Sequence, residues 1–169
     1  HQRGVKRRSS FERAVHAAAP SCDIETWDGT LVGKRASLRK RVPQYVRFMP
    51  RNWDAASIEE AAPAHRAVSM LKIDCEGCEK QNMVPLFEMI ADKKIFVDQI
   101  QIEMHVHNIK YNPNNAVEGI YKWFSAMDKA RMRIVHKEWN HWASEKNPCI
   151  EYLFVSEDFL RTANEHAVC

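Results

Sequence analysis

The stretch from residue 68 to residue 104 restricts the fold of this chain more than any other part of its 169 residues. Residues 68–74 form a mostly apolar run that ends in Asp74, and a short C-E-G-C-E turn follows. Residues 80–92 then have a helical pattern, and residues 95–104 form a second apolar run. Two apolar strands joined by a helix are typical of a parallel βαβ unit, because strands in such sheets are buried on both faces.

The same alternation of strands and helices extends over the rest of the chain. The other expected elements are helices at residues 11–18, 57–62 and 115–130, and strands at residues 22–27, 45–49, 132–135 and 150–155. The last two strands are separated by a polar loop and can pair as an antiparallel edge. The pattern predicts a single α/β domain with a mostly parallel sheet, in which ligands bind beyond the carboxyl ends of the strands.

Composition and charge exclude several classes of protein. The chain is 45% hydrophobic and 28% charged, with a net charge of +3, as in globular proteins. Its apolar runs are all shorter than the roughly 18 residues that a membrane span needs. The basic stretch at residues 34–41 has no accompanying array of aromatic side chains for stacking bases, so nucleic acid is not the expected partner.

Acidic side chains follow three of the predicted strands. Asp28 follows the early strand, Asp74 and Glu76 follow the central one, and Glu103 with His105 ends the next. An acid after an early strand is well placed to accept both hydroxyls of a ribose. His105 is the best candidate for a general base by residue type, because histidine titrates near neutral pH.

Plainer interpretations of these residues stay open. A single acid at a strand end can be a turn or helix cap, and His105 can be a structural hydrogen-bonding residue. A metal site is a further alternative, since Asp74, Glu76, Glu103, His105 and His107 are suitable ligands. No fixed ligand spacing supports that alternative, so we do not expect a bound metal.

The five cysteines include one C-x-x-C pair, Cys75 and Cys78. A structural zinc site needs about four ligands, and no second pair follows. An odd number of cysteines leaves at least one outside any disulfide within the chain. We expect Cys75 and Cys78 to form neither a disulfide nor a metal pair, because they flank a turn that requires glycine rather than sulfur.

The turn after the central strand resembles a known family signature. Residues 71–79 read L-K-I-D-C-E-G-C-E and are similar to the L-K-I-D-x-E-G-x-E motif of FkbM-like methyltransferases and of a related eukaryotic methyltransferase-like group. Four further segments resemble family segments in the same order, at residues 4–12, 101–105, 136–140 and 149–155. The resemblance spans nearly the whole chain, and the nine-residue signature is its most specific part.

The resemblance implies a class I methyltransferase that uses S-adenosylmethionine, with a Rossmann-like sheet whose last strand is antiparallel. It implies that Gly4, Asp28 and Asp74 bind the cofactor. His105 and Glu103 are then the candidate catalytic residues, and Glu76, His136 and Asn140 are the candidate substrate-binding residues. The acceptor class is open to sugar, lipid, small metabolite or protein, with a hydroxyl group and a small or glycan-like molecule as the leading candidates.

Two features depart from the family pattern. Only three residues precede Gly4, so we expect a chain that lacks the first strand of the sheet, with residues 1–169 forming one N-terminally truncated domain. The glycine loop near Gly4 also contains one glycine where the fold usually has two or three. The alternative function is therefore a catalytically degenerate methyltransferase fold that binds a ligand or partner. The sequence indicates neither compartment nor oligomeric state.

Overall fold

The computed structural model describes residues 10–29, 42–54, 57, 67–75, 77–105, 113–140 and 149–162. The expectations for Gly4, Glu76, His107, the basic stretch at residues 34–41 and most of the helix at residues 57–62 lie outside these residues. The chain forms two compact units, residues 1–53 with 168–169, and residues 54–167. Each unit is described separately below.

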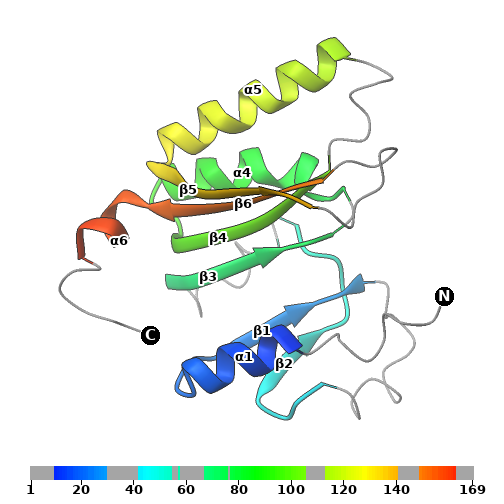
Figure 1. Cartoon of the computed structure of the whole chain (residues 1–169), viewed down its shortest axis with the longest axis vertical. Helices are drawn as coiled ribbons and strands as arrows, with labels where there is room; N and C mark the ends of the chain where they lie inside the picture. The colour runs from blue at the N-terminus through cyan, green and yellow to red at the C-terminus, as the bar shows by residue number, and fades with distance from the viewer. Residues whose placement is uncertain are drawn as a thin grey trace. The chain divides into compact units, whose positions relative to one another are not determined.

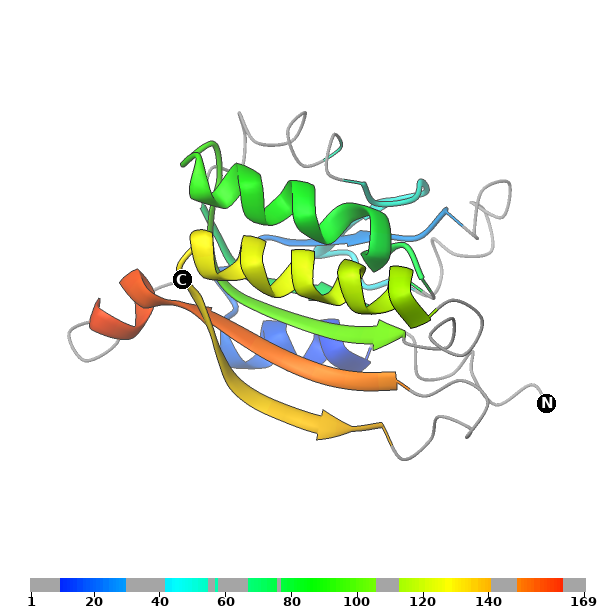
Figure 2. The same cartoon turned by 90° about the horizontal axis from the view of Figure 1, so that it is seen from above.

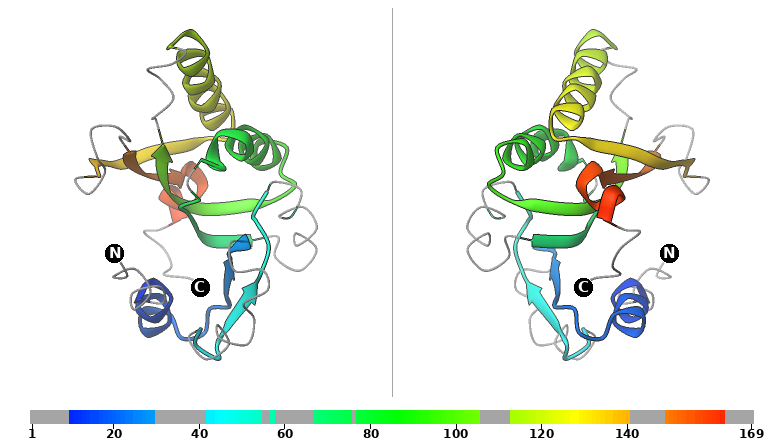
Figure 3. Two further views of the ribbon diagram at one scale, coloured as in Figure 1. Left: turned by 90° about the vertical axis from the view of Figure 1, so that its right-hand side faces the viewer. Right: turned by 90° about the vertical axis from the view of Figure 1, so that its left-hand side faces the viewer.

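The first unit contains one helix and one pair of strands. Helix α1 (Ser10–Ala18) lies beside strands β1 (Ile24–Trp27) and β2 (Val46–Met49), which pair in parallel (Figure 3). The Thr26 hydroxyl donates a hydrogen bond to Glu12 Oε1 across 3.2 Å and ties the helix to β1. All three elements were expected from the sequence, and the structure confirms them with slightly shorter strands.

The second unit is built on a four-stranded mixed sheet. Its strands are β3 (Ala67–Ile73), β4 (Phe96–His105), β5 (Met132–Trp139) and β6 (Cys149–Ser156), in the order β3-β4-β6-β5 (Figure 1). The pair β3–β4 is parallel, and β6 is antiparallel to both β4 and β5. The structure therefore confirms the α/β class, the parallel pairing of residues 68–73 with residues 97–102 and the antiparallel last strand, and it shows a mixed sheet rather than a mostly parallel one.

Helices α4 (Glu79–Ala91) and α5 (Pro113–Lys129) both lie on one face of this sheet, as Figures 1 and 2 show. Phe87 of α4 meets Phe154 edge to face, with ring centroids 5.9 Å apart, and Phe124 of α5 meets Tyr152 in the same way. Side chains alternate between the faces of a strand. The neighbours of Phe154 and Tyr152 along β6 therefore point to the other face.

One expectation for the sheet is wrong. The apolar run at residues 68–73 was expected in the buried centre, but within the described residues β3 pairs with β4 alone and forms an edge of the four-stranded sheet. Met70 in β3 is 42% exposed, whereas Ile100 in β4 is fully buried.

The opposite edge of the sheet is formed by β5. This strand contains a register irregularity between Ile134 and His136, where it passes β6. Ile134, Val135 and Trp139 are 44–52% exposed, and every residue from Ile134 to Trp139 is exposed. Along the same stretch, Lys137 and Glu138 add charged side chains.

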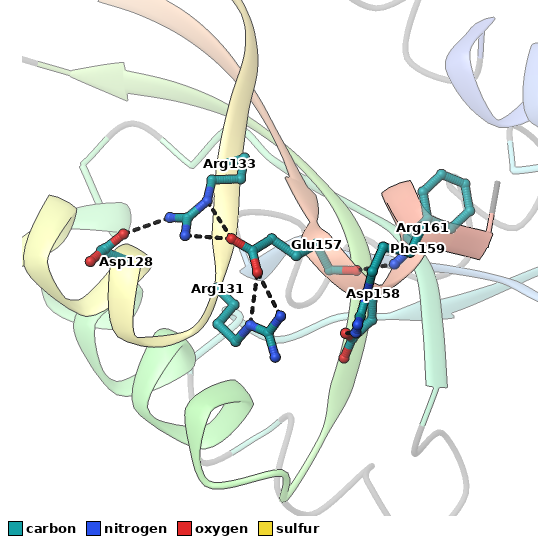
Figure 4. Close-up of polar contacts among 8 residues, drawn as sticks. Asp128, Arg131, Arg133, Glu157, Asp158, Phe159 and Arg161 are labelled. Carbon is teal, nitrogen blue, oxygen red and sulfur yellow. Dashed lines mark hydrogen bonds and ion pairs between the residues drawn. The ribbon is translucent and has the colours of Figure 1, made fainter. Parts of the chain in front are cut away.

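Ion pairs fasten helix α6 (Glu157–Thr162) to the beginning of β5 (Figure 4). Glu157 accepts hydrogen bonds from Arg131 Nε at 2.8 Å and from Arg133 Nε at 2.7 Å. Arg133 also donates to Asp128 across 2.5 Å. These contacts lower the pKa of Glu157, with the hydrogen bond from Arg131 as the largest cause and that from Arg133 next.

None of the helices in the described ranges is long and apolar enough to cross a membrane.

The Glu157 contacts predict a pH-dependent contribution to stability. A carboxyl group whose pKa is lowered by folding stabilises the protein above its ordinary pKa, and this stabilisation is lost as the pH falls. We expect Glu157→Gln to lower the Tm at pH 7, with the difference from the parent shrinking as the pH approaches 3. Thermal denaturation followed by circular dichroism tests this, with Glu88→Gln on the exposed face of α4 as the matched control. An equal Tm difference at both pH values would contradict the prediction.

Candidate functional site

A row of acidic residues crosses the carboxyl end of the parallel pair. Ile73 of β3 is in register with Ile102 of β4, so Asp74 stands beside Glu103. Glu103 is opposite Glu151 of β6, and Glu151 is opposite Glu138 of β5. Residues directly opposite one another share a face of the sheet. We call Asp74, Glu103, Glu151 and Glu138 the acidic row, and it lies on the face opposite α4 and α5.

The charges of this row act on one another. The pKa of Glu151 is raised, first by burial and then by the charge of Glu103, with smaller effects from Asp74 and Glu138. Glu151 Oε2 is buried and has no hydrogen-bond partner among the described residues. Lys72 opposes these effects, and its Nζ lies 3.7 Å from Asp74 Oδ2. Lys72 therefore offsets part of the repulsion within the row.

Two candidate substrate-binding residues contact members of the row. Asn140 follows β5, and its Nδ2 donates a hydrogen bond to Glu103 Oε1 across 2.6 Å. His136 is exposed on β5, with its Nε2 3.5 Å from Glu138 Oε2. Asn140 thus lies beside a candidate catalytic residue, whereas His136 lies at the outer strand of the sheet.

A buried carboxylate lies next to this row and holds His105. Glu79, in the first turn of α4, is fully buried. Its Oε1 accepts hydrogen bonds from the His105 backbone N–H at 3.1 Å and is 2.8 Å from His105 Nδ1. Its Oε2 accepts a hydrogen bond from the Gly77 backbone N–H at 2.8 Å. Since Glu79 is a carboxylate, the proton between it and the ring belongs on Nδ1, which leaves Nε2 as the ring nitrogen that can accept a proton.

Glu79 is the residue to which sequence reasoning assigned no role. It closes the L-K-I-D-x-E-G-x-E signature, and that position was the available signal. The glutamate of the same motif that was expected to bind substrate, Glu76, lies outside the described residues. Glu79 lies in the first turn of α4, and its side chain reaches back to His105 at the end of β4. This position follows from the three-dimensional fold and not from the local sequence pattern.

The expectation that Cys75 and Cys78 are not bonded is wrong. They form a disulfide, with their Cα atoms 5.5 Å apart. Gly77 has φ of +115°, a conformation that glycine adopts readily, and the resulting tight turn brings the two cysteines within the usual disulfide range. Glycine and sulfur are therefore compatible in this turn. Cys22 is also disulfide-bonded, and buried Cys149 is in no disulfide.

Two groups of potential metal ligands occur near His105. Ligand atoms of Glu103, His105 and Cys149 lie within 4.8 Å of one another, as do those of Cys75, Cys78 and Glu79. The disulfide occupies both sulfur atoms of the second group. The first group has the mixture of oxygen, nitrogen and sulfur donors that a transition metal can use.

Asp28 belongs to the first unit and follows β1 directly, as expected. Its backbone N–H donates a hydrogen bond to the Met49 carbonyl at 3.1 Å. The next residue is Gly29, where an added Cβ would lie 2.7 Å from the backbone nitrogen of Asn52. A carboxylate at a strand end, followed by a turn that only glycine fits, matches the chemistry needed to accept two ribose hydroxyls.

The acidic row predicts that removing one charge stabilises the unit. A carboxyl group whose pKa is raised by folding favours the folded state less as the pH rises through its titration range. We expect Glu151→Gln to raise the Tm at pH 7 and to have little effect at pH 4. Two like charges at directly opposite positions on paired strands destabilise a sheet by about 0.2–1 kcal/mol. We expect a gain in stability near the lower of these values, because Glu151 is partly exposed and solvent screens its charge. Thermal melts at the two pH values, with Glu88→Gln on the exposed face of α4 as the control, test this, and a lower Tm at pH 7 would contradict it.

The chain was compared with protein families, curated proteins and solved structures. A family model described as a methyltransferase domain matches residues 53–156. A comparison with curated proteins found no match. A crystal structure of a mutant 16S rRNA (adenine(1408)-N(1))-methyltransferase from Catenulisporales acidiphilia is 9% identical, with a TM-score of 0.46, over 90% of this chain and 81% of that chain. The N-terminal domain of EvdMO1 with SAH bound is 13% identical, with a TM-score of 0.42, over 88% and 80%.

The family model covers more than half of the chain, including β3, α4, β4 and the strands that carry the acidic row. S-adenosylmethionine is the methyl donor that this assignment implies. The chain belongs to the methyltransferase-domain family.

Proposed function

We propose that this chain is an FkbM-like enzyme that transfers a methyl group from S-adenosylmethionine to a hydroxyl group of a small or glycan-like acceptor. Support comes from the family match, the signature at residues 71–79 and the buried pair of Glu79 and His105. The 2.8 Å contact between Glu79 Oε1 and His105 Nδ1 is the observation that carries the proposal. It provides a base for an acceptor that must lose a proton.

Two residues of the described part suit the cofactor. The family resemblance assigns Asp28 to the ribose hydroxyls and Asp74 to the boundary between cofactor and acceptor. When bound, S-adenosylmethionine supplies an electrophilic methyl group on a positively charged sulfur. The protein's main contribution is to hold the acceptor oxygen in line with that methyl group, because positioning alone accounts for much of such catalysis.

The Glu79–His105 pair suits proton removal from a hydroxyl. Glu79 fixes the imidazole ring through Nδ1, so Nε2 can accept the acceptor's proton, and the buried carboxylate stabilises the imidazolium that forms. His105 is 5% exposed, which keeps competing water from most of its surface. Glu103, whose side chain is fixed by Asn140, can accept a second hydrogen bond from the acceptor.

The acidic row favours a polyhydroxyl acceptor over nucleic acid. Carboxylates are hydrogen-bond acceptors only, and they match the hydroxyl groups of a sugar-like molecule. A phosphate backbone would meet Asp74, Glu103, Glu151 and Glu138 with charges of the same sign. The proposed acceptor class is therefore neutral and rich in hydroxyl groups.

Cofactor binding is tested first. We expect the full chain to bind S-adenosylhomocysteine, and Asp28→Ala to weaken binding about tenfold to a hundredfold, because a lost hydrogen bond to a charged group costs about 1.5–3 kcal/mol. Isothermal titration calorimetry measures the affinity, and Asp23→Ala, just before β1, is the matched control. Equal affinities for Asp28→Ala and the parent chain would contradict the assignment of Asp28.

Methyl transfer is tested with a panel of neutral methyl glycosides and their amino-sugar counterparts, by following S-adenosylhomocysteine release and product mass. We expect transfer to a glycoside hydroxyl and a loss of about 10²–10⁴ in kcat for His105→Gln, the usual contribution of a general base. Glu118→Gln on α5 is the control. Transfer only to the amines would contradict the hydroxyl acceptor. Cofactor binding without transfer to any acceptor would favour a degenerate binding module.

A further inference from the structure

We propose that the Cys75–Cys78 disulfide is a thiol–disulfide exchange site for a dithiol reductant, and that its redox state sets how firmly Glu79 holds His105. The proposal rests on the proposed function only where it concerns methyl transfer. The exchange and its effect on His105 depend on the described geometry alone.

The disulfide encloses the turn that leads into Glu79. It joins residues three apart in the sequence, between the end of β3 and the start of α4. Cys75 Sγ lies 3.4 Å from Glu79 Oε2, and the N–H of Gly77, inside the disulfide loop, donates to the same oxygen at 2.8 Å. The other oxygen of the carboxylate holds His105. One carboxylate therefore joins the disulfide loop to the candidate base.

Reduction changes the chemistry of the contact between sulfur and oxygen. A disulfide sulfur carries no proton, so Cys75 cannot donate a hydrogen bond to Glu79 in the oxidised state. A thiol at the same position can donate, and 3.4 Å is a suitable S–H···O separation. Glu79 then shares its negative charge with one more donor and is a weaker acceptor for the proton on His105 Nδ1.

The two sulfur atoms occupy different electrostatic surroundings. Cys78 directly precedes α4, where the N-terminal end of the helix stabilises a thiolate. Cys75 lies against the Glu79 carboxylate, which disfavours a second negative charge. Cys78 is thus the better leaving thiolate, and Cys75 retains the proton that it can donate to Glu79.

The dithiol reductant supplies the electrons and protons that the exchange requires. One thiolate of the dithiol attacks a sulfur of the pair, the Cys75–Cys78 bond breaks, and a mixed disulfide forms. The second thiol of the reductant then attacks the mixed disulfide, and the reductant leaves as a cyclic disulfide. Two electrons and two protons pass from the dithiol to the cysteines. Both cysteines are partly exposed, so a dithiol can reach them.

A purely structural role suits this disulfide poorly. A crosslink stabilises a protein mainly by restricting the unfolded chain, and this effect grows with the length of the closed loop. A disulfide between residues three apart closes a very short loop, so it restricts the unfolded chain little and adds little stability. Cys22, which is also disulfide-bonded, serves as the internal reference for the order in which the disulfides are reduced.

Mass spectrometry with differential alkylation tests the exchange in the folded full chain. The chain is equilibrated with EDTA over a series of reduced to oxidised dithiothreitol ratios, and the alkylation of each cysteine is measured. We expect Cys75 and Cys78 to become alkylated together. This should occur at a lower ratio of reduced to oxidised dithiothreitol than the ratio that reduces Cys22 or unfolds the chain. Reduction of this pair only together with Cys22 or with unfolding would overturn the exchange site.

NMR tests the link to His105 without cofactor or acceptor. In protein with ¹⁵N-labelled histidine, the signal of the proton on His105 Nδ1 should lie downfield in the oxidised chain. Reduction of the disulfide should move this signal upfield. Cys78→Ala and Cys75→Ser both open the loop and retain a donor at residue 75, so they should resemble the reduced chain. Cys75→Ala opens the loop without a donor and should resemble the oxidised chain. Identical Hδ1 signals in all these forms would overturn the link.

The effect on activity separates this proposal from the proposed function. If the chain methylates a glycoside, reduction and Cys75→Ser should each lower kcat by about tenfold, the effect of weakening one charged hydrogen bond, and Cys75→Ala should not. Unchanged kcat in Cys75→Ser would overturn the regulation. Absence of methyl transfer in every form would count against the proposed function and would leave the alkylation and NMR results to decide the exchange site.

Discussion

The Glu79 carboxylate is the interaction on which the organisation of the candidate site depends. It is fully buried at the start of α4 and receives hydrogen bonds from Gly77 on one oxygen and from His105 on the other. Removing a carboxylate from water is costly unless its oxygens are satisfied, so these donors must stay in place. The turn after β3, the first turn of α4 and the last residue of β4 are thereby held in one arrangement. The candidate base His105, at the end of β4, therefore has a fixed ring orientation before any ligand arrives.

The sequence predicted much of the fold because the relevant signals are local. The apolar runs at residues 68–74 and 95–104 identified the parallel pair, and the polar loop between the last two strands indicated an antiparallel edge. Burial of β3 was mispredicted, since an apolar run shows what a strand can bury but not which strands lie beside it. Glu79 and the disulfide depend on how a turn folds back in space, and periodicity along the chain contains no such information.

The acidic row shows how strand register can create a site that single strands do not reveal. Asp74 and Glu103 were recognised as strand-end acids, but Glu151 and Glu138 come from the two antiparallel strands and join the row only through pairing. Four carboxylates across one face produce mutual repulsion, and Lys72 offsets only part of it. This part of the unit is therefore less stable than neutral side chains would make it. Such local cost is common where surfaces are arranged for binding.

Strand β5 is an edge strand, and no described strand pairs with its outer side. Exposed edge strands can pair with strands of other molecules, and apolar side chains such as Val135 and Trp139 would strengthen that pairing. The irregularity between Ile134 and His136 interrupts the regular hydrogen-bonding pattern of this edge, and Lys137 and Glu138 add charges beside it. The bulge thus acts as protection against intermolecular sheet extension. A strand of a second molecule would find a less regular row of hydrogen-bonding groups along β5 than along an undisturbed edge.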